Sequence, residues 1–199
     1  KMSEIIFQKV LPLGKITIYN SAPNISDLVE IHQTHSAEIV EYNGTDISQI
    51  QADGILVMNE NIEKRSFAIK TADCMPVVLI GKEGVCIIHA GWVGLRDKIL
   101  INKDIKKINP YYCYIAPSIG VDSFEVQEDF RLNFPNSPYF VQNEGYLSFD
   151  LIKEATQQIQ SFFPNIKVEN STECTFKSHM YNSFRRDKTA ERNWNIFSI

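Results

Sequence analysis

Short apolar runs separated by polar turns fill the first two thirds of the chain. Most runs are about five residues long, the usual length of a strand, and Gly, Asn, Asp and Pro occupy the gaps between them. Several runs are apolar at every position, as expected for strands that are covered on both faces. The pattern predicts seven strands, at residues 15–19, 38–42, 54–58, 66–70, 76–80, 85–89 and 111–115.

A helical spacing of apolar residues occurs in two places, and a weaker pattern predicts a third helix at residues 128–133. The first set follows Gly94 and consists of Leu95, Ile99, Leu100, Ile105 and Ile108. The second begins after Asp150, a suitable N-cap, and consists of Ile152, Ala155, Ile159 and Phe162. Because strands outnumber helices and do not alternate with them regularly, the sequence predicts an α+β fold of mixed β-sheets layered against helices.

Length and composition are those of a compact domain. Of the 199 residues, 44% are hydrophobic and 22% are charged, which is enough to bury a sizeable core and excludes a disordered chain. No repeat, linker or block of charge divides the sequence. Residues 1–199 are therefore expected to form a single domain.

The charge balance and the apolar runs restrict the partners. Twenty basic residues against 24 acidic residues give a formal net charge of −4, which provides no attraction for polyanions, so nucleic acid is not an expected partner. The longest apolar run, Cys74–Ile80, is far too short to cross a bilayer, and no signal-peptide pattern is present. We therefore expect a cytoplasmic protein that has no membrane partner.

Four cysteines occur without a CxxC pair and without regular spacing. Cys86 and Cys113 lie inside apolar runs, and both they and Cys174 fit the pattern of small structural residues. Cys74 differs, because it follows Asp73 in a short turn between two predicted strands, and sites are often located on loops that strands hold rigid.

Two histidines occupy similar positions, in turns or at the ends of predicted elements. His89 ends a strand just before the glycine-rich turn of residues 91–94, and His35 lies in the polar turn of residues 33–36. Two imidazoles and the Cys74 thiolate form a donor set that suits Zn²⁺, and three protein ligands leave a fourth position for water or substrate. His32, three residues before His35, is expected on the other face and is not a predicted ligand.

The same residues have other interpretations. Without a metal, Cys74 is a candidate nucleophile and His89 is its candidate base. Both also fit structural roles, as a buried turn thiol and a hydrogen-bonded core histidine. Asp73 equally fits an acid that bonds the backbone of its own turn.

Anion binding is predicted at two places. The turn from Gly91 to Gly94 opens a predicted helix, whose free N–H groups suit an anion. Near the end of the chain, Arg185, Arg186 and Arg192 gather three guanidinium groups, which suit phosphate or carboxylate. Surface salt bridges are the alternative explanation for these arginines.

The motifs resemble those of one family, the YfiH-like proteins, also called the multicopper polyphenol oxidoreductase or laccase-domain family, whose members are described as purine nucleoside phosphorylases. The most specific stretches are Asp73-Cys74-Met75-Pro76 and His89-Ala90-Gly91-Trp92. All matching stretches follow the family's order, at residues 33–36, 52–54, 71–76, 89–95, 116–120, 124–126, 150–151, 174–175 and 183–186.

The resemblance implies a metal centre made by His35, Cys74 and His89, with Zn²⁺ as the ion and Cu²⁺ as the alternative. It also implies an α+β fold with mixed sheets, shared distantly with toxins that are Cys/His hydrolases. Cys74 and His89 are then the expected catalytic residues, together with Asp73, which orients a ligand or carries a proton.

The substrate site follows from the same resemblance. Arg185 and Arg186 are expected to bind phosphate, and Trp92 is expected to stack on a purine. Family members usually carry arginine where Val93 stands, and Arg96, one helical turn later, is the predicted replacement. An Arg96→Ala substitution is accordingly expected to weaken saturation by phosphate.

The resemblance implies the function of a zinc-dependent purine nucleoside phosphorylase that acts on adenosine, inosine or S-methyl-5′-thioadenosine, with adenosine deamination as a possible additional activity, for which a three-ligand zinc supplies an activated water. Its expected partners are a small purine nucleoside and phosphate. Three alternatives stay open: a copper-dependent polyphenol oxidase, a Cys/His amide hydrolase that edits peptidoglycan precursors, and a non-enzymatic metal-binding module.

Overall fold

A computed structural model describes residues 3–62 and 65–199, and its centre is a six-stranded sheet. The strand order is β13-β9-β7-β8-β5-β4. Each of the inner strands β9, β7, β8 and β5 is antiparallel to its inner neighbours, whereas β13 and β4 pair in parallel at the two edges. The strands are β4 (Ile39–Tyr42), β5 (Gly54–Met58), β7 (Met75–Gly81), β8 (Gly84–Ala90), β9 (Pro110–Ile115) and β13 (Lys167–Asn170).

A five-stranded sheet with the order β1-β2-β14-β6-β3 packs against the central sheet. The C-terminal strand β14 lies between β2 and β6 and is antiparallel to both. The strands are β1 (Ile5–Val10), β2 (Lys15–Tyr19), β3 (Leu28–Val29), β6 (Ser66–Thr71) and β14 (Asn193–Ser198).

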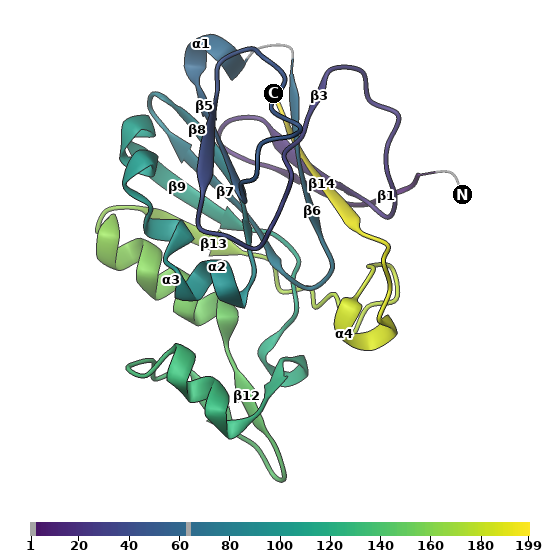
Figure 1. Ribbon diagram of the computed structural model, residues 1–199, viewed down its shortest axis with the longest axis vertical. Helices are drawn as coiled ribbons and strands as arrows, with labels where there is room; N and C mark the ends of the chain where they lie inside the picture. The colour runs from purple at the N-terminus through teal and green to yellow at the C-terminus, as the bar shows by residue number, and fades with distance from the viewer. Residues whose placement is uncertain (1–2, 63–64) are drawn as a thin grey trace.

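Helices α2 (Trp92–Arg96) and α3 (Leu151–Phe162) lie on one side of the central sheet and the five-stranded sheet lies on the other (Figure 1), and the central sheet separates two hydrophobic cores. On one face, Met75, Val77 and Leu79 of β7 belong to the core that the helices cover. On the other face, Val78 and Ile80 belong to the core shared with the five-stranded sheet. Since successive side chains of a strand point to opposite faces, cover on both sides explains why β7 is apolar throughout.

The helical segments are short, apart from α3 (Leu151–Phe162). This helix confirms the prediction made from Asp150, whose side chain accepts a hydrogen bond from the backbone N–H of Lys153. The predicted segment at residues 128–133 is present as a 3₁₀ helix. The remaining segments are α1 (Asn59–Ile62), α2 (Trp92–Arg96), η1 (Ile99–Ile101), η2 (Lys103–Ile108), η3 (Val121–Ser123), η4 (Glu128–Asn133) and α4 (Phe184–Asp187).

The prediction of a continuous helix after Gly94 is wrong. Lys98 has a left-handed backbone, with φ of 67°, and separates α2 from η1. Asn102 then starts η2 by accepting a hydrogen bond from the N–H of Asp104. The apolar residues of this stretch are nevertheless buried, so the spacing indicated the buried face but not the breaks between the helices.

A small sheet of β10 (Glu125–Val126), β12 (Leu147–Phe149) and β11 (Phe140–Gln142) completes the fold. All seven predicted strands are present within one residue at each end, and the predicted α+β class with layered mixed sheets is confirmed. The predicted domain also includes residues 1, 2, 63 and 64, which lie outside the described residues. Among the helices that are described, none has the length and apolar character needed to cross a membrane.

Candidate metal centre and its cavity

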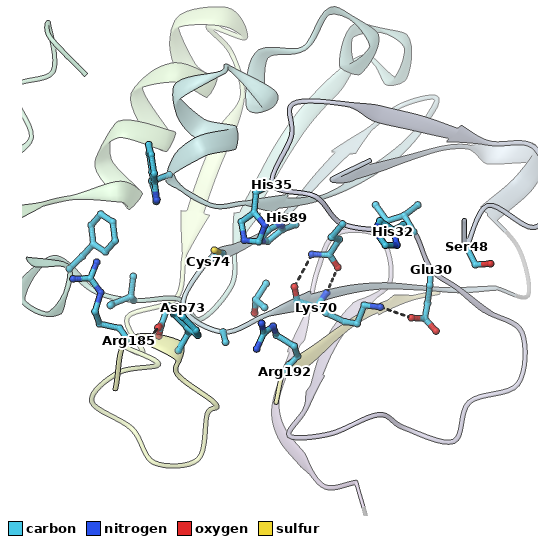
Figure 2. Close-up of a pocket in the computed structure, with 18 of the residues that line it drawn as sticks. Glu30, His32, His35, Ser48, Lys70, Asp73, Cys74, His89, Arg185 and Arg192 are labelled. Carbon is cyan, nitrogen blue, oxygen red and sulfur yellow. Dashed lines mark hydrogen bonds and ion pairs between the residues drawn. The ribbon is translucent and has the colours of Figure 1, made fainter. Parts of the chain in front are cut away.

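Three side chains from separate loops and strands meet at one end of the central sheet (Figure 2). Cys74 directly precedes β7, and His89 lies near the end of the neighbouring strand β8. His35 lies in the loop between β3 and β4. Their ligand atoms all lie within 4.8 Å of one another, so the structure brings together the three residues that the sequence singled out.

Asp53 holds the loop that carries His35. Its side chain is fully buried and accepts hydrogen bonds from the backbone N–H groups of Thr34, His35 and Ser36, at 3.2, 3.1 and 2.6 Å. The Ser36 hydroxyl donates to the same carboxylate at 2.8 Å. These bonds fix His35 in a left-handed backbone conformation, with φ of 60°, which is uncommon for a residue other than glycine.

Asp53 also sets the orientation of the His89 ring. The Asp53 carboxylate lies 2.7 Å from Nδ1 of His89. Burial alone would raise the pKa of Asp53, but hydrogen bonds from His89 and Ser36 outweigh it and lower the pKa to about 2. An ionised carboxylate only accepts hydrogen bonds, so Nδ1 of His89 carries a proton and the neutral ring has its lone pair at Nε2.

The thiol of Cys74 lies next to both imidazoles. Burial alone would raise the pKa of Cys74, but hydrogen bonds with His35 and His89 lower it to about 6. Burial alone would lower the pKa of His89, whereas its bonds with Asp53 and Cys74 raise it to about 9. Without a metal, the cluster therefore favours a thiolate beside an imidazolium at neutral pH.

The cluster fits a metal ion such as Zn²⁺ or Cu²⁺. Its donors are one thiolate and two imidazoles, and tetrahedral Zn²⁺ with bonds of about 2.0–2.3 Å places such ligand atoms about 3.5 Å apart. The spacing of up to 4.8 Å is close enough for small side-chain rotations to complete the set. Gly91 keeps the approach clear, because a Cβ atom there would lie 3.0 Å from Sγ of Cys74 and 3.5 Å from Cδ2 of His35.

Asp73 has a different environment from the ligands beside it. One carboxylate oxygen accepts a hydrogen bond from the Thr175 hydroxyl at 2.8 Å, and the other accepts one from the backbone N–H of Arg185 at 2.7 Å. Its backbone lies in the left-handed region, with φ of 89°. Asp73 thus joins the Cys74 loop to α4 and to the segment before it, and both of its oxygens are engaged.

The cluster opens into a cavity of about 870 Å³. His35, Cys74 and His89 contribute to its wall, as do the aromatic residues Trp92, Phe124 and Phe184. Figure 2 shows Arg185 on one side of the cluster and the Lys70–Glu30 ion pair on the other, and Lys70 Nζ lies 3.0 Å from Glu30. This size is within the range of cavities that bind small molecules.

The predicted anion-binding arginines do not all reach this cavity. Arg185 contributes to its wall, but Arg186 and Arg96 do not. The Arg186 guanidinium donates to four backbone carbonyls, of Thr175, Phe176, Ser178 and Tyr181, and therefore holds the chain before α4.

Arg96 is also turned away from the cluster. Its guanidinium donates to Asp97 at 2.7 and 3.0 Å and lies over the Trp92 ring, 5.4 Å from the centroid. It borders a second cavity, of about 520 Å³, between α2, η4 and α3. Arg96 therefore does not take the place in the wall of the cluster's cavity that the resemblance led us to expect for it.

Several important residues were not predicted from the sequence as site residues. Asp53 is the main one: it lies in the matching stretch of residues 52–54 and directly before a buried strand, but no role was predicted for it. Lys70 and Gln33 also contribute to the cavity wall. Gln33 lies in the matching stretch of residues 33–36, but only His35 of that stretch was predicted as a site residue. His32 lies in the wall as well, but it is not part of the His35, Cys74 and His89 cluster.

The sequence is similar to a known protein family and to several known proteins. The model of the family described as multi-copper polyphenol oxidoreductase laccase matches residues 17–198. A purine nucleoside phosphorylase of Aquifex aeolicus is 31% identical over 166 residues, which cover 80% of this chain and 77% of the relative. A protein named adenosine deaminase RL5, from an unknown prokaryotic organism, is 28% identical over 120 residues, covering 53% of this chain and 46% of that protein.

Solved structures have the same fold. The crystal structure of the hypothetical protein YfiH of Bacillus licheniformis superimposes with a TM-score of 0.75 and 24% sequence identity. The match covers 87% of this chain and 74% of that chain.

Proposed function

The chain belongs to the multi-copper polyphenol oxidoreductase laccase family, and we propose that it is a zinc-dependent purine nucleoside phosphorylase. The observation that carries the proposal is the His35, Cys74 and His89 cluster, which opens into a cavity lined by both aromatic and cationic side chains. A purine nucleoside and phosphate require these two kinds of contact. The name of the Aquifex relative supports the same activity.

The metal is held by His35, Cys74 and His89 in this proposal. When bound, Zn²⁺ with three protein ligands supplies a Lewis acid with an open coordination position. Asp53 keeps Nδ1 of His89 protonated, so that Nε2 is free to bind the ion.

Phosphorolysis joins a phosphate oxygen to C1′ of the ribose and breaks the bond between C1′ and the purine nitrogen. The purine leaves with the electron pair and takes up a proton. The protein must therefore hold the phosphate close to C1′, orient the base and exclude water.

Arg185 and Arg192 are the anion-binding residues in this proposal. Both contribute to the cavity wall, and the ion pairs found in the described part of the chain include neither of them. Nη1 of Arg192 donates to the carbonyls of Thr189 and Glu191, which leaves Nε and Nη2 for two phosphate oxygens. Arg185 is held in a similar way, by a bond from Nη1 to the carbonyl of Glu125.

The purine is held by Trp92, Phe124 and Phe184 in this proposal. Trp92 is fixed by an edge contact with Phe130, whose ring centroid lies 5.3 Å away. Phe184 is 51% exposed at the cavity wall, so a bound purine would cover apolar surface that is open to water.

Adenosine deamination is the second activity proposed for this cavity, because one relative carries the name of an adenosine deaminase. In this reaction, water replaces the amino group at C6 of the purine and ammonia leaves. The base would have to bind with C6, rather than C1′, near the cluster. Phosphate dependence separates the two reactions, since deamination does not consume phosphate.

The test is incubation of the purified protein with adenosine, inosine and S-methyl-5′-thioadenosine, with and without phosphate, followed by chromatography. Free base that forms only with phosphate supports phosphorolysis, and inosine from adenosine without phosphate supports deamination. Cys74→Ser should abolish both, whereas Cys174→Ser, a matched change at a cysteine outside the cluster, should keep them. No product from any of the three nucleosides would overturn the proposal.

A further inference from the structure

The side chain of Gln33 makes a two-point contact with β6. Its Nε2 donates to the carbonyl of Lys70 at 2.8 Å, and its Oε1 accepts a hydrogen bond from the backbone N–H of Lys70, also at 2.8 Å. A side-chain amide that bonds both backbone groups of one residue reproduces the pairing of an adjacent strand. The contact is therefore more specific in geometry than a single hydrogen bond.

The contact lies beyond the point where the backbone pairing between β3 and β6 has ended. β3 pairs in parallel with β6 only from Leu28 to Val29. Gln33 resumes this pairing further along, at Lys70. The chain between β3 and β4 is thus attached to β6 at a second point, close to the cluster.

Gln33 and Lys70 stand just before two of the three cluster residues. His35 follows Gln33 by two residues, and Cys74 follows Lys70 by four. The Asp53 carboxylate joins the His35 loop to His89, but its hydrogen bonds do not extend to the Cys74 segment. Gln33 supplies a connection to the backbone of the strand before Cys74, beside the side-chain ion pair of Lys70 and Glu30.

Both connected loops contain backbone conformations that need support. His35 has φ of 60° and Asp73, next to Cys74, has φ of 89°. Residues other than glycine remain in this region only where the surrounding structure holds them there. A contact between the His35 loop and the strand that leads into the Cys74 loop therefore bears on the separation of the His35 ring and the Cys74 thiol.

We propose that Gln33 is a positioning residue, which fixes the His35 loop against the Cys74 loop so that these two ligands are in place before a metal ion binds. The proposal rests on the metal centre of the proposed function and does not depend on the nucleoside reaction. Residues that orient ligands typically change metal affinity by about 10–100-fold when they are replaced.

The test compares Gln33→Leu, which removes both hydrogen bonds at similar side-chain length, with Gln33→Glu, which keeps the acceptor for the Lys70 N–H but loses the donor. Gln49→Leu is the matched control, because Gln49 also lies in the cavity wall but makes no bond to either ligand loop. Zn²⁺ affinity of the metal-stripped proteins is measured by competition with a chromophoric chelator. The Co²⁺ forms report the ligand geometry through their visible absorption spectra.

We expect Gln33→Leu to bind Zn²⁺ about 10-fold or more weakly than the unsubstituted protein and to give an altered Co²⁺ spectrum, with Gln33→Glu intermediate and Gln49→Leu unchanged. If Gln33→Leu does not fold, Gln33→Glu alone decides, and unchanged affinity in it overturns the proposal. Unchanged affinity and spectrum in a folded Gln33→Leu protein overturn the positioning role while the metal centre stands. An unsubstituted protein that binds neither Zn²⁺ nor Co²⁺ overturns both this inference and the proposed metal centre.

Discussion

Two buried aspartates organise opposite sides of the same cavity. Asp53 bonds the loop of His35 and the ring of His89. Asp73 bonds the Thr175 hydroxyl and the backbone N–H of Arg185. Asp53 thus arranges the proposed metal ligands, whereas Asp73 holds the segment that brings Arg185 to the cavity wall.

The partners of the two carboxylates explain what each one does. Asp53 faces a titratable ring, and its negative charge raises the pKa of His89. Asp73 bonds only a hydroxyl and a backbone amide, both uncharged. The charge of Asp53 therefore matters for the chemistry of the cluster, whereas Asp73 acts mainly by fixing a position.

The largest effect is expected from Asp53→Asn. The amide cannot accept all the hydrogen bonds of the carboxylate, and it leaves the His89 ring without its charged partner. We expect Zn²⁺ affinity to fall about 100-fold and the free energy of unfolding to fall by about 3–5 kcal/mol. Asp129→Asn, at an exposed aspartate in η4, is the control. Zn²⁺ affinity equal to that of the unsubstituted protein, measured by chelator competition, would contradict the role given to Asp53.

The charge state of Cys74 can be measured through the pH dependence of its alkylation. In the metal-stripped protein, its thiolate should dominate above a pKa of about 6, so alkylation by iodoacetamide should rise with pH through a midpoint near 6. At pH 7 the thiolate fraction is then about 30-fold larger than for a thiol with an ordinary pKa of about 8.5.

The two aspartates should affect this midpoint differently. Asp53→Asn weakens the imidazolium of His89 and should move the midpoint to higher pH, whereas Asp73→Asn should leave it nearly unchanged. Mass spectrometry of the peptide that contains Cys74 measures the rate. A midpoint near 8.5 in the unsubstituted protein would show that the imidazoles do not stabilise the thiolate.

Asp73→Asn tests the other side of the cavity. Asparagine tolerates the left-handed backbone at this position, so the substitution changes the hydrogen bonds more than the loop conformation. We expect zinc content to be unchanged and KM for phosphate to rise about 10-fold, because the segment of Arg185 is held less firmly. Loss of bound zinc together with activity would instead place Asp73 with the metal ligands.

The smallest effect is expected from Arg96→Ala. Its guanidinium bonds Asp97 and lies outside the cavity of the cluster, so KM for phosphate should change by less than about two-fold. This outcome differs from the one expected from the sequence alone. A large increase in KM for phosphate in steady-state kinetics would show instead that Arg96 contributes to phosphate binding.

The sequence was informative where local patterns determine the structure. Continuous apolar runs predicted the inner strands of the central sheet, because these are covered on both faces. The same pattern did not predict β14, whose buried Asn195 donates through Nδ2 to the carbonyl of Ile69 and the hydroxyl of Thr71, partners more than 120 residues away. Polar residues in a strand become acceptable only through such distant contacts.

Some residues of the candidate site could likewise be predicted from the sequence, whereas others could not. His35, Cys74 and His89 were predicted because few side chains have their chemistry. The roles of Asp53, Gln33 and the arginines depend on which groups surround them, and residue type does not encode that. Arg185 and Arg186 are adjacent in sequence, yet only Arg185 contributes to the cavity wall.

Elemental analysis of protein prepared without added metal, with Cys74→Ser analysed beside it, tests the central claim most directly. We expect about one zinc per chain in the unsubstituted protein, and loss of both zinc and phosphorolysis in Cys74→Ser. Phosphorolysis by a protein that contains no zinc, or full zinc content in Cys74→Ser, would contradict it.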